Sequence, residues 1–156
     1  MGLRGGALTA WALWALVACG GEEPAAPTLT LRFGVSEGVR ESPNLVDELR
    51  GAVYGSIFRR AEVTVTGPQE DAEAVLDLEV TGVDVREDEV SAASWEAALP
   101  APDLYVFLGF FDVDGNGEVE RDPEAGDPVT LPFANDFEVE EGVSVELTAQ
   151  FDLVLN

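Results

Sequence analysis

The stretch VSVELTAQFDLVL, residues 143–155, decides the fold. Apolar and polar residues alternate across its thirteen positions, except that Val154 is apolar where a polar residue is due. Successive side chains of a strand point to opposite faces, so a period of two predicts a β-strand with one buried face. The residues predicted to face inward are Val143, Val145, Leu147, Ala149, Phe151, Leu153 and Leu155.

The same period recurs through the rest of the chain. Residues 28–35, TLTLRFGV, repeat it with Leu29, Leu31, Phe33 and Val35 predicted inward. Shorter alternating segments occupy 62–67, 74–80 and 136–142, the last closed by a Glu-Gly pair. The phase shifts by one residue at Gly82, which predicts a β-bulge there.

One short segment has the signals of a helix. Ser42 stands at the capping position, Pro43 in the first turn and Gly51 just beyond the end, which predicts a helix over 43–49. Residues 92–99, AASWEAAL, fit either a strand or a helix. Several short strands separated by turn signals favour an all-β fold. We therefore predict an antiparallel β-sandwich, Ig-like or prealbumin-like, with one short helix.

Composition limits the function. The chain has 31 acidic and 8 basic residues, with a net charge of −23, and all the basic residues are Arg. Nucleic acid is not an expected partner, because phosphate binding needs basic patches. The absence of His excludes a Ser-His-Asp site, and the absence of Lys excludes a Lys-bearing phosphate loop. The chain is therefore not expected to be an enzyme, although a carboxylate-based, glycosidase-like hydrolase stays open as an alternative.

The N-terminus carries a targeting pattern. Arg4 precedes an apolar run of eleven residues, 7–17. That run is shorter than the roughly 20 residues that span a bilayer and has the proportions of a signal-peptide core. It ends in LVAC, residues 16–19, which resembles the lipobox of bacterial lipoproteins. The resemblance implies that Cys19 carries the lipid and begins the mature protein; an ordinary secretory signal is the alternative.

This resemblance implies a domain plan and a location. Residues 1–18 would be the lipoprotein signal peptide, 19–27 the lipidated Cys and a flexible tether, and 28–156 the β-sandwich domain. Cys19 is the only Cys of the chain, so it has no internal disulfide partner. The protein would contact the membrane through this lipid in the cell envelope. Gly20, in place of the Asp that retains many such lipoproteins at the inner membrane, favours the outer membrane.

The C-terminal third resembles a family of secreted modules. LPAPDLYVFLGFFDVDGNG, residues 99–117, and the hairpin-like 137–155 resemble transthyretin-like, carboxypeptidase-regulatory-type sandwiches. Such modules are usually non-catalytic spacers, stabilisers or binding units, which implies an unidentified protein or glycan partner. A subunit of a larger envelope assembly is another alternative. The stretch YVFLGFFD, 105–112, is apolar on both faces, so a second cover is needed, either 43–49, 87–99 or another molecule.

The acidic loop after this stretch resembles an EF-hand calcium loop. Asp112, Asp114, Asn116 and Gly117 stand at positions one, three, five and six of that pattern. Pro123 stands where the closing bidentate Glu should be, so Asp122, Glu124 or Asp127 would have to complete the shell. The flanking segments read as extended chain, so the paired helices of an EF-hand are not expected.

The loop predicts a calcium site. Its ligands are oxygens, which suit Ca²⁺, whereas Zn²⁺ and copper prefer His or thiolate. A solvated turn without an ion is the alternative. The predicted set is Asp112, Asp114, Asn116, Glu118 through its carbonyl, and a carboxylate from Glu120, Asp122 or Glu124.

Overall fold

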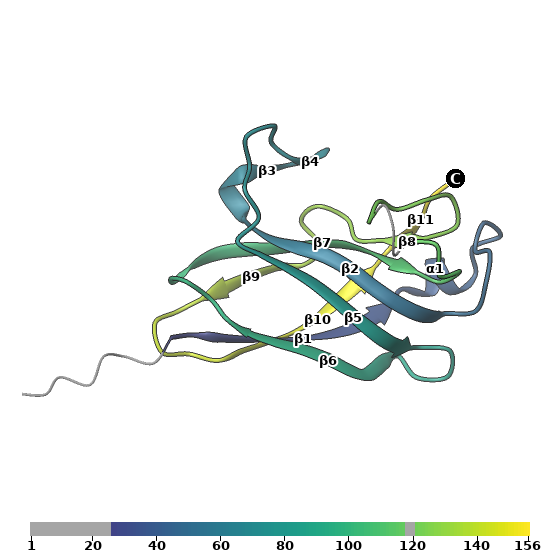
Figure 1. The fold of residues 1–156 in the computed structure, drawn as a ribbon, viewed down its shortest axis with the longest axis horizontal. Coiled ribbons are helices and arrows are strands. Elements are labelled where there is room, and N and C mark those ends of the chain that lie inside the picture. Colours follow the sequence, from purple (N-terminus) through teal and green to yellow (C-terminus); the bar gives the residue numbers. More distant parts are fainter. Residues whose placement is uncertain (1–25, 118–120) are drawn as a thin grey trace, which may run out of the picture.

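The computed structural model describes residues 26–117 and 121–156. The predicted signal segment, Cys19, Glu118 and Glu120 lie outside these described residues. Within the described part, two β-sheets face each other as the layers of a sandwich (Figure 1). The predicted all-β sandwich is confirmed.

The two layers differ in size. The smaller sheet has the order β10-β1-β6, formed by Val145–Phe151, Thr28–Val35 and Val90–Ala98. The larger has the order β11-β8-β7-β2-β5, formed by Leu153–Val154, Pro128–Val129, Asp103–Asp112, Arg50–Arg59 and Leu76–Asp84, and β9 (Asp136–Val139) also pairs with β7. Helix α1 (Glu37–Arg40) follows β1. The 3₁₀ helix η1 (Arg60–Glu62) leads into a small hairpin of β3 (Val63–Thr64) and β4 (Gly67–Pro68), which projects from the body in Figure 1.

The first and last long strands lie side by side. β1 pairs with β10 in parallel, with Leu31 opposite Leu147 and Val35 opposite Phe151. The other strand pairs of the described residues are antiparallel. More than a hundred residues separate β1 from β10, so no tight hairpin constrains their relative direction.

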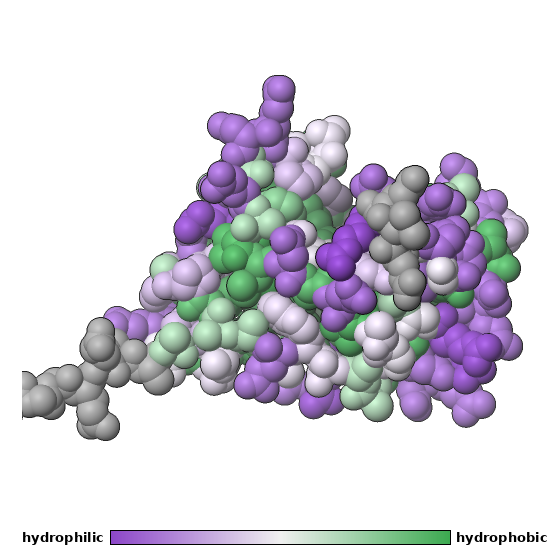
Figure 2. All heavy atoms as spheres, viewed as in Figure 1, coloured by the Kyte–Doolittle hydropathy of each residue, from purple (hydrophilic) through white to green (hydrophobic). Residues whose placement is uncertain are grey.

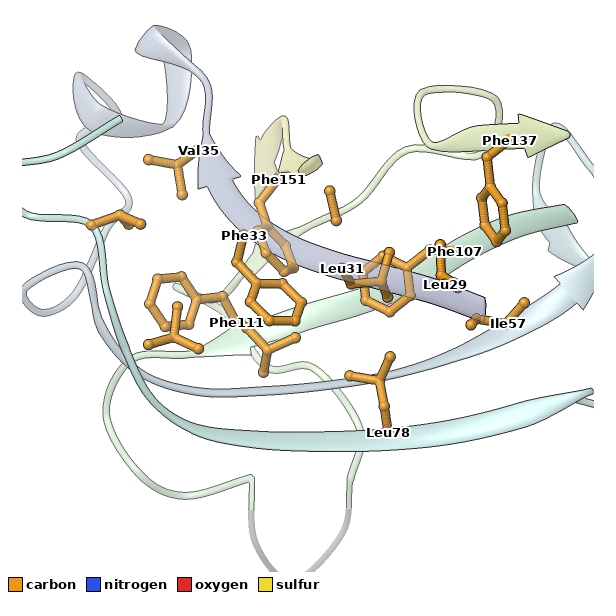
Figure 3. Close-up of a cluster of buried hydrophobic side chains, with 14 of the residues drawn as sticks. Leu29, Leu31, Phe33, Val35, Ile57, Leu78, Phe107, Phe111, Phe137 and Phe151 are labelled. Carbon is orange, nitrogen blue, oxygen red and sulfur yellow. The ribbon is translucent and has the colours of Figure 1, made fainter. Parts of the chain in front are cut away.

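Aromatic and aliphatic side chains from both sheets fill the space between the layers (Figure 3). The four inward residues predicted in β1, Leu29, Leu31, Phe33 and Val35, are all buried. The ring centroids of Phe33 and Phe107 lie 6.4 Å apart, and those of Phe111 and Phe151 lie 5.8 Å apart. These edge-on and tilted contacts join the two sheets.

The prediction for residues 143–155 is right in the middle and wrong at both ends. Ala149 and Phe151 are fully buried, but Val143 and Leu153 are 43% and 46% exposed, and Leu155 is only half-buried. After Phe151 the chain leaves the smaller sheet, and β11 joins β8 in the larger one. The phase changes at this crossing, so Val154 is buried in place of Leu153.

The helix predicted over 43–49 is wrong, because the helix lies earlier, at Glu37–Arg40. The Ser42 hydroxyl does accept a backbone bond from Asn44 (3.3 Å), but it closes a turn. Ser, Pro and Asn favour turns, so this stretch forms a turn in place of a helix. The chain then has no regular structure as far as β2, with Leu49 buried and Val46 59% exposed.

Four smaller predictions have clear outcomes. The bulge at Gly82 is confirmed, because Gly51 pairs with Val83 and Ala52 with Thr81, so Gly82 is left over with φ +74°. The ambiguous segment 92–99 falls largely in strand β6, and 136–142 contains β9. The single strand predicted over 62–67 is wrong: the chain reverses there in the β3–β4 hairpin, whose Val65 is 76% exposed.

Candidate metal centre

The predicted calcium loop begins at the end of β7, where Asp112 is buried. Backbone N–H groups of Gly115 (2.8 Å) and Asn116 (3.2 Å) donate to Oδ1 of Asp112, and that of Gly117 (3.2 Å) donates to Oδ2. Gly115 has φ +78°, a conformation that glycine adopts without strain. The loop therefore wraps around the Asp112 carboxylate and satisfies it with main-chain donors.

Asn116 lies between two further carboxylates. Its Nδ2 donates to Oδ2 of Asp114 (2.9 Å) and to Oε2 of Glu124 (3.2 Å). Its backbone N–H also donates to Oδ1 of Asp114 (3.2 Å). The predicted ligands Asp112, Asp114, Asn116 and Glu124 thus lie in one connected network, and a half turn of the Asn116 amide would present its oxygen instead of its nitrogen.

Asp127 enters the same loop from further along the chain. It is buried, its Oδ2 accepts the backbone N–H of Glu124 (3.0 Å), and its carbonyl accepts the N–H of Leu155 (3.1 Å). Burial raises the pKa of the Asp127 carboxyl, and the neighbouring carboxylates of Asp112 and Asp114 raise it further. The backbone bonds from Glu124 and Val113 act in the opposite direction. A nearby cation would favour the charged carboxylate.

Three carboxylates converge in this network. Asp112, Asp114 and Asp127 each offer an oxygen, and these atoms lie within 4.8 Å of one another. Asp127 is one of the three residues expected to be able to complete the shell, but it is not in the predicted ligand set. Its position directly before β8, which pairs with β7 at Phe110, brings it back to the end of β7. A cluster of oxygen donors of this kind is suited to a hard cation.

Asp122 lies elsewhere. It is exposed and lines a separate cleft of about 670 Å³ on the outer face of the larger sheet. The walls of this cleft cover part of the second apolar face of β7, whose Leu108 and Phe110 line it. Segments 121–123 and 129–132 and the β3–β4 hairpin form its walls, and the described lining includes no residue of 43–49 or 87–99, the covers predicted within the chain.

No protein-family model, curated protein or solved structure matches this chain. Among the described residues, no helix has the length and apolar character needed to cross a membrane.

Proposed function

We propose that this protein is a lipid-anchored, non-catalytic β-sandwich module of the cell envelope, stabilised by Ca²⁺. The observation that carries the cation part is the convergence of Asp112, Asp114 and Asp127 at the end of β7. Two of these three carboxylates are buried. Buried carboxylates repel one another, so an ion among them would turn a cost into a stabilising contact.

Calcium suits this loop better than other common ions. The donor set is carboxylate with an amide and a further carboxylate nearby, from Asn116 and Glu124. Ca²⁺ accepts six to eight oxygen ligands in flexible geometry, whereas Mg²⁺ demands a tight octahedron and keeps its waters. With position 12 of the pattern occupied by Pro123, the affinity is expected to be weak, with a dissociation constant on the order of 10⁻⁴–10⁻³ M.

Thermal unfolding of the whole chain in non-ionic detergent tests the cation. At a free calcium of about 100 times the dissociation constant, the fold should gain ~2.7 kcal/mol, which raises the melting temperature by several degrees above that in EDTA. Mg²⁺ should give a smaller shift. Identical melting curves in EDTA and calcium would leave only a solvated turn.

The anchor rests on the sequence LVAC at 16–19 and the apolar run before it. Several acyl chains on one Cys would hold the protein stably at a membrane, where a single chain is marginal. Mass spectrometry of the N-terminal peptide tests this part. We expect a mature chain that begins at a lipidated Cys19; an unmodified thiol, or cleavage after it, would refute the anchor.

The non-catalytic role is supported by where the carboxylates lie. Asp77 and Asp122 line the cleft but are exposed, so they lack the burial by which hydrolases raise the pKa of a general acid. Asp112 and Asp127 are buried, but neither lines the cleft. A screen with glycoside substrates tests this: turnover that a single Asp→Asn change abolishes would favour the hydrolase alternative.

A further inference from the structure

The cleft on the outer face of the larger sheet has an apolar floor. Phe58 of β2 and Leu108 of β7 contribute to it, and Pro68 of the β3–β4 hairpin and Pro132 contribute to its sides. Figure 2 shows apolar atoms gathered beneath the projecting hairpin, with polar atoms beside them. A volume of about 670 Å³ lies within the range of small-molecule sites.

The charges at this cleft are predominantly acidic. Its described charged residues are Asp77, Arg121 and Asp122. The Arg121 guanidinium is already paired with the Glu79 carboxylate at 2.9 Å. The Ser56 hydroxyl donates to Oδ1 of Asp77 (2.6 Å) and so orients that carboxylate at the cleft. With a net charge of −23 on the whole chain, the field at this site attracts cations and repels anions.

Two arginines of the protein each contact both an aromatic ring and a carboxylate. The Arg60 guanidinium lies 3.9 Å from the centre of the Phe133 ring and 2.9 Å from the Asp136 carboxylate. Within the cleft lining, Arg121 lies over the Tyr54 ring at 5.9 Å, in addition to its pairing with Glu79. A positive group between an aromatic face and a carboxylate gains from both contacts.

From this charge complementarity we infer that the cleft binds a small organic cation with an apolar or aromatic body. The body contacts Phe58 and Leu108, and the positive group is neutralised by Asp77 and Asp122. The inference goes beyond the proposed function. None of Asp112, Asp114 and Asp127 lines the cleft, so failure of one site leaves the other intact.

Benzyltrimethylammonium is a suitable probe, titrated into the ¹⁵N-labelled whole chain in non-ionic detergent with saturating calcium. We expect shifts in the amide signals of Ser56, Phe58 and Leu108. Phenylacetate, an anion with the same ring, should leave these signals in place. The double variant Asp77→Asn/Asp122→Asn should weaken probe binding about fivefold or more, because both neutralising charges are lost.

A second double variant separates the cleft from the general field of an acidic protein. Asp71→Asn/Asp88→Asn also removes two negative charges, but from exposed positions outside the described lining of the cleft. It should change the affinity less than twofold, within the range expected for screened surface charges. Equal weakening by both double variants, equal binding of phenylacetate, or shifts centred on Asp112, Asp114 and Asp127 would each overturn the inference.

Discussion

Gly55 of β2 lies directly opposite Gly109 of β7 in the larger sheet. The Phe107 ring occupies the space beside both, so a Cβ at position 55 or 109 would come within 2.6 or 2.7 Å of that ring. Backbone oxygens of Leu108 and Tyr54 lie equally close to these two positions, at 2.6 and 2.5 Å. The pair of glycines therefore makes room for a fully buried aromatic ring at the centre of the core.

Substituting either glycine by Ala should destabilise the fold. Because the closest atoms include rigid backbone, the change forces the strands or the ring to move, at a cost of ~1–3 kcal/mol in the free energy of unfolding. Denaturant unfolding of Gly55→Ala and Gly109→Ala measures this cost. Gly38→Ala is the control, since its Cβ would meet nothing closer than 3.8 Å and Ala is the better helix former. Equal stability of all three variants would contradict the role given to the glycine pair.

Asn135 should matter through its side chain. It is buried, its Oδ1 accepts the backbone N–H of Gln150 (2.8 Å), and its Nδ2 donates to the Gln150 carbonyl (3.0 Å). The amide thus takes the place of a neighbouring strand at the edge of β10. Asn135→Ala would leave both main-chain groups without this partner, at an expected cost of ~1–3 kcal/mol.

Hydrogen exchange gives a local readout for Asn135→Ala. The Gln150 amide should exchange much faster in the variant, whereas Ser94→Ala, an exposed change in β6, should alter neither exchange nor stability. Unchanged protection at Gln150 would show that the Asn135 side chain is dispensable.

Sequence patterns within a single segment predicted the features that depend on that segment alone. The alternation in 28–35 identified β1 and its inward face, and the phase shift identified the bulge at Gly82. The failures occur where tertiary pairing decides. Leu153 is exposed and not buried as predicted, because the chain crosses to the other sheet at Asp152. The Asp152 N–H donates to the Val129 carbonyl. Asp127 reaches the carboxylate cluster because β8 pairs with β7, a contact that the spacing along the chain does not encode.

Tyr105 should make the fold sensitive to alkali. Burial raises the pKa of its phenol above the usual 10.0, and the Asp103 charge adds to this. Its hydroxyl donates to the Ala101 carbonyl (2.7 Å). The folded state holds the proton more tightly than the unfolded state, so this stability is present below pH 10 and is lost as pH rises through the folded pKa.

Denaturant unfolding at a series of alkaline pH values measures this loss. The Tyr105→Phe variant lacks the ionising group, so its stability should fall less steeply above pH 10 than that of the unchanged protein. Parallel curves for the two proteins would mean that Tyr105 does not govern the alkaline response.

Asp127→Asn should separate the cation from the fold. The Asn keeps an oxygen that accepts the Glu124 N–H but loses the negative charge. The calcium-dependent rise in melting temperature should therefore disappear or nearly so. In EDTA the variant should melt no lower than the unchanged protein, because it lacks a carboxylate whose charged form is disfavoured by burial and by Asp112 and Asp114. Asp122→Asn, an exposed change outside the cluster, should keep the full calcium shift. A calcium shift that survives Asp127→Asn would place the ion elsewhere on this acidic protein.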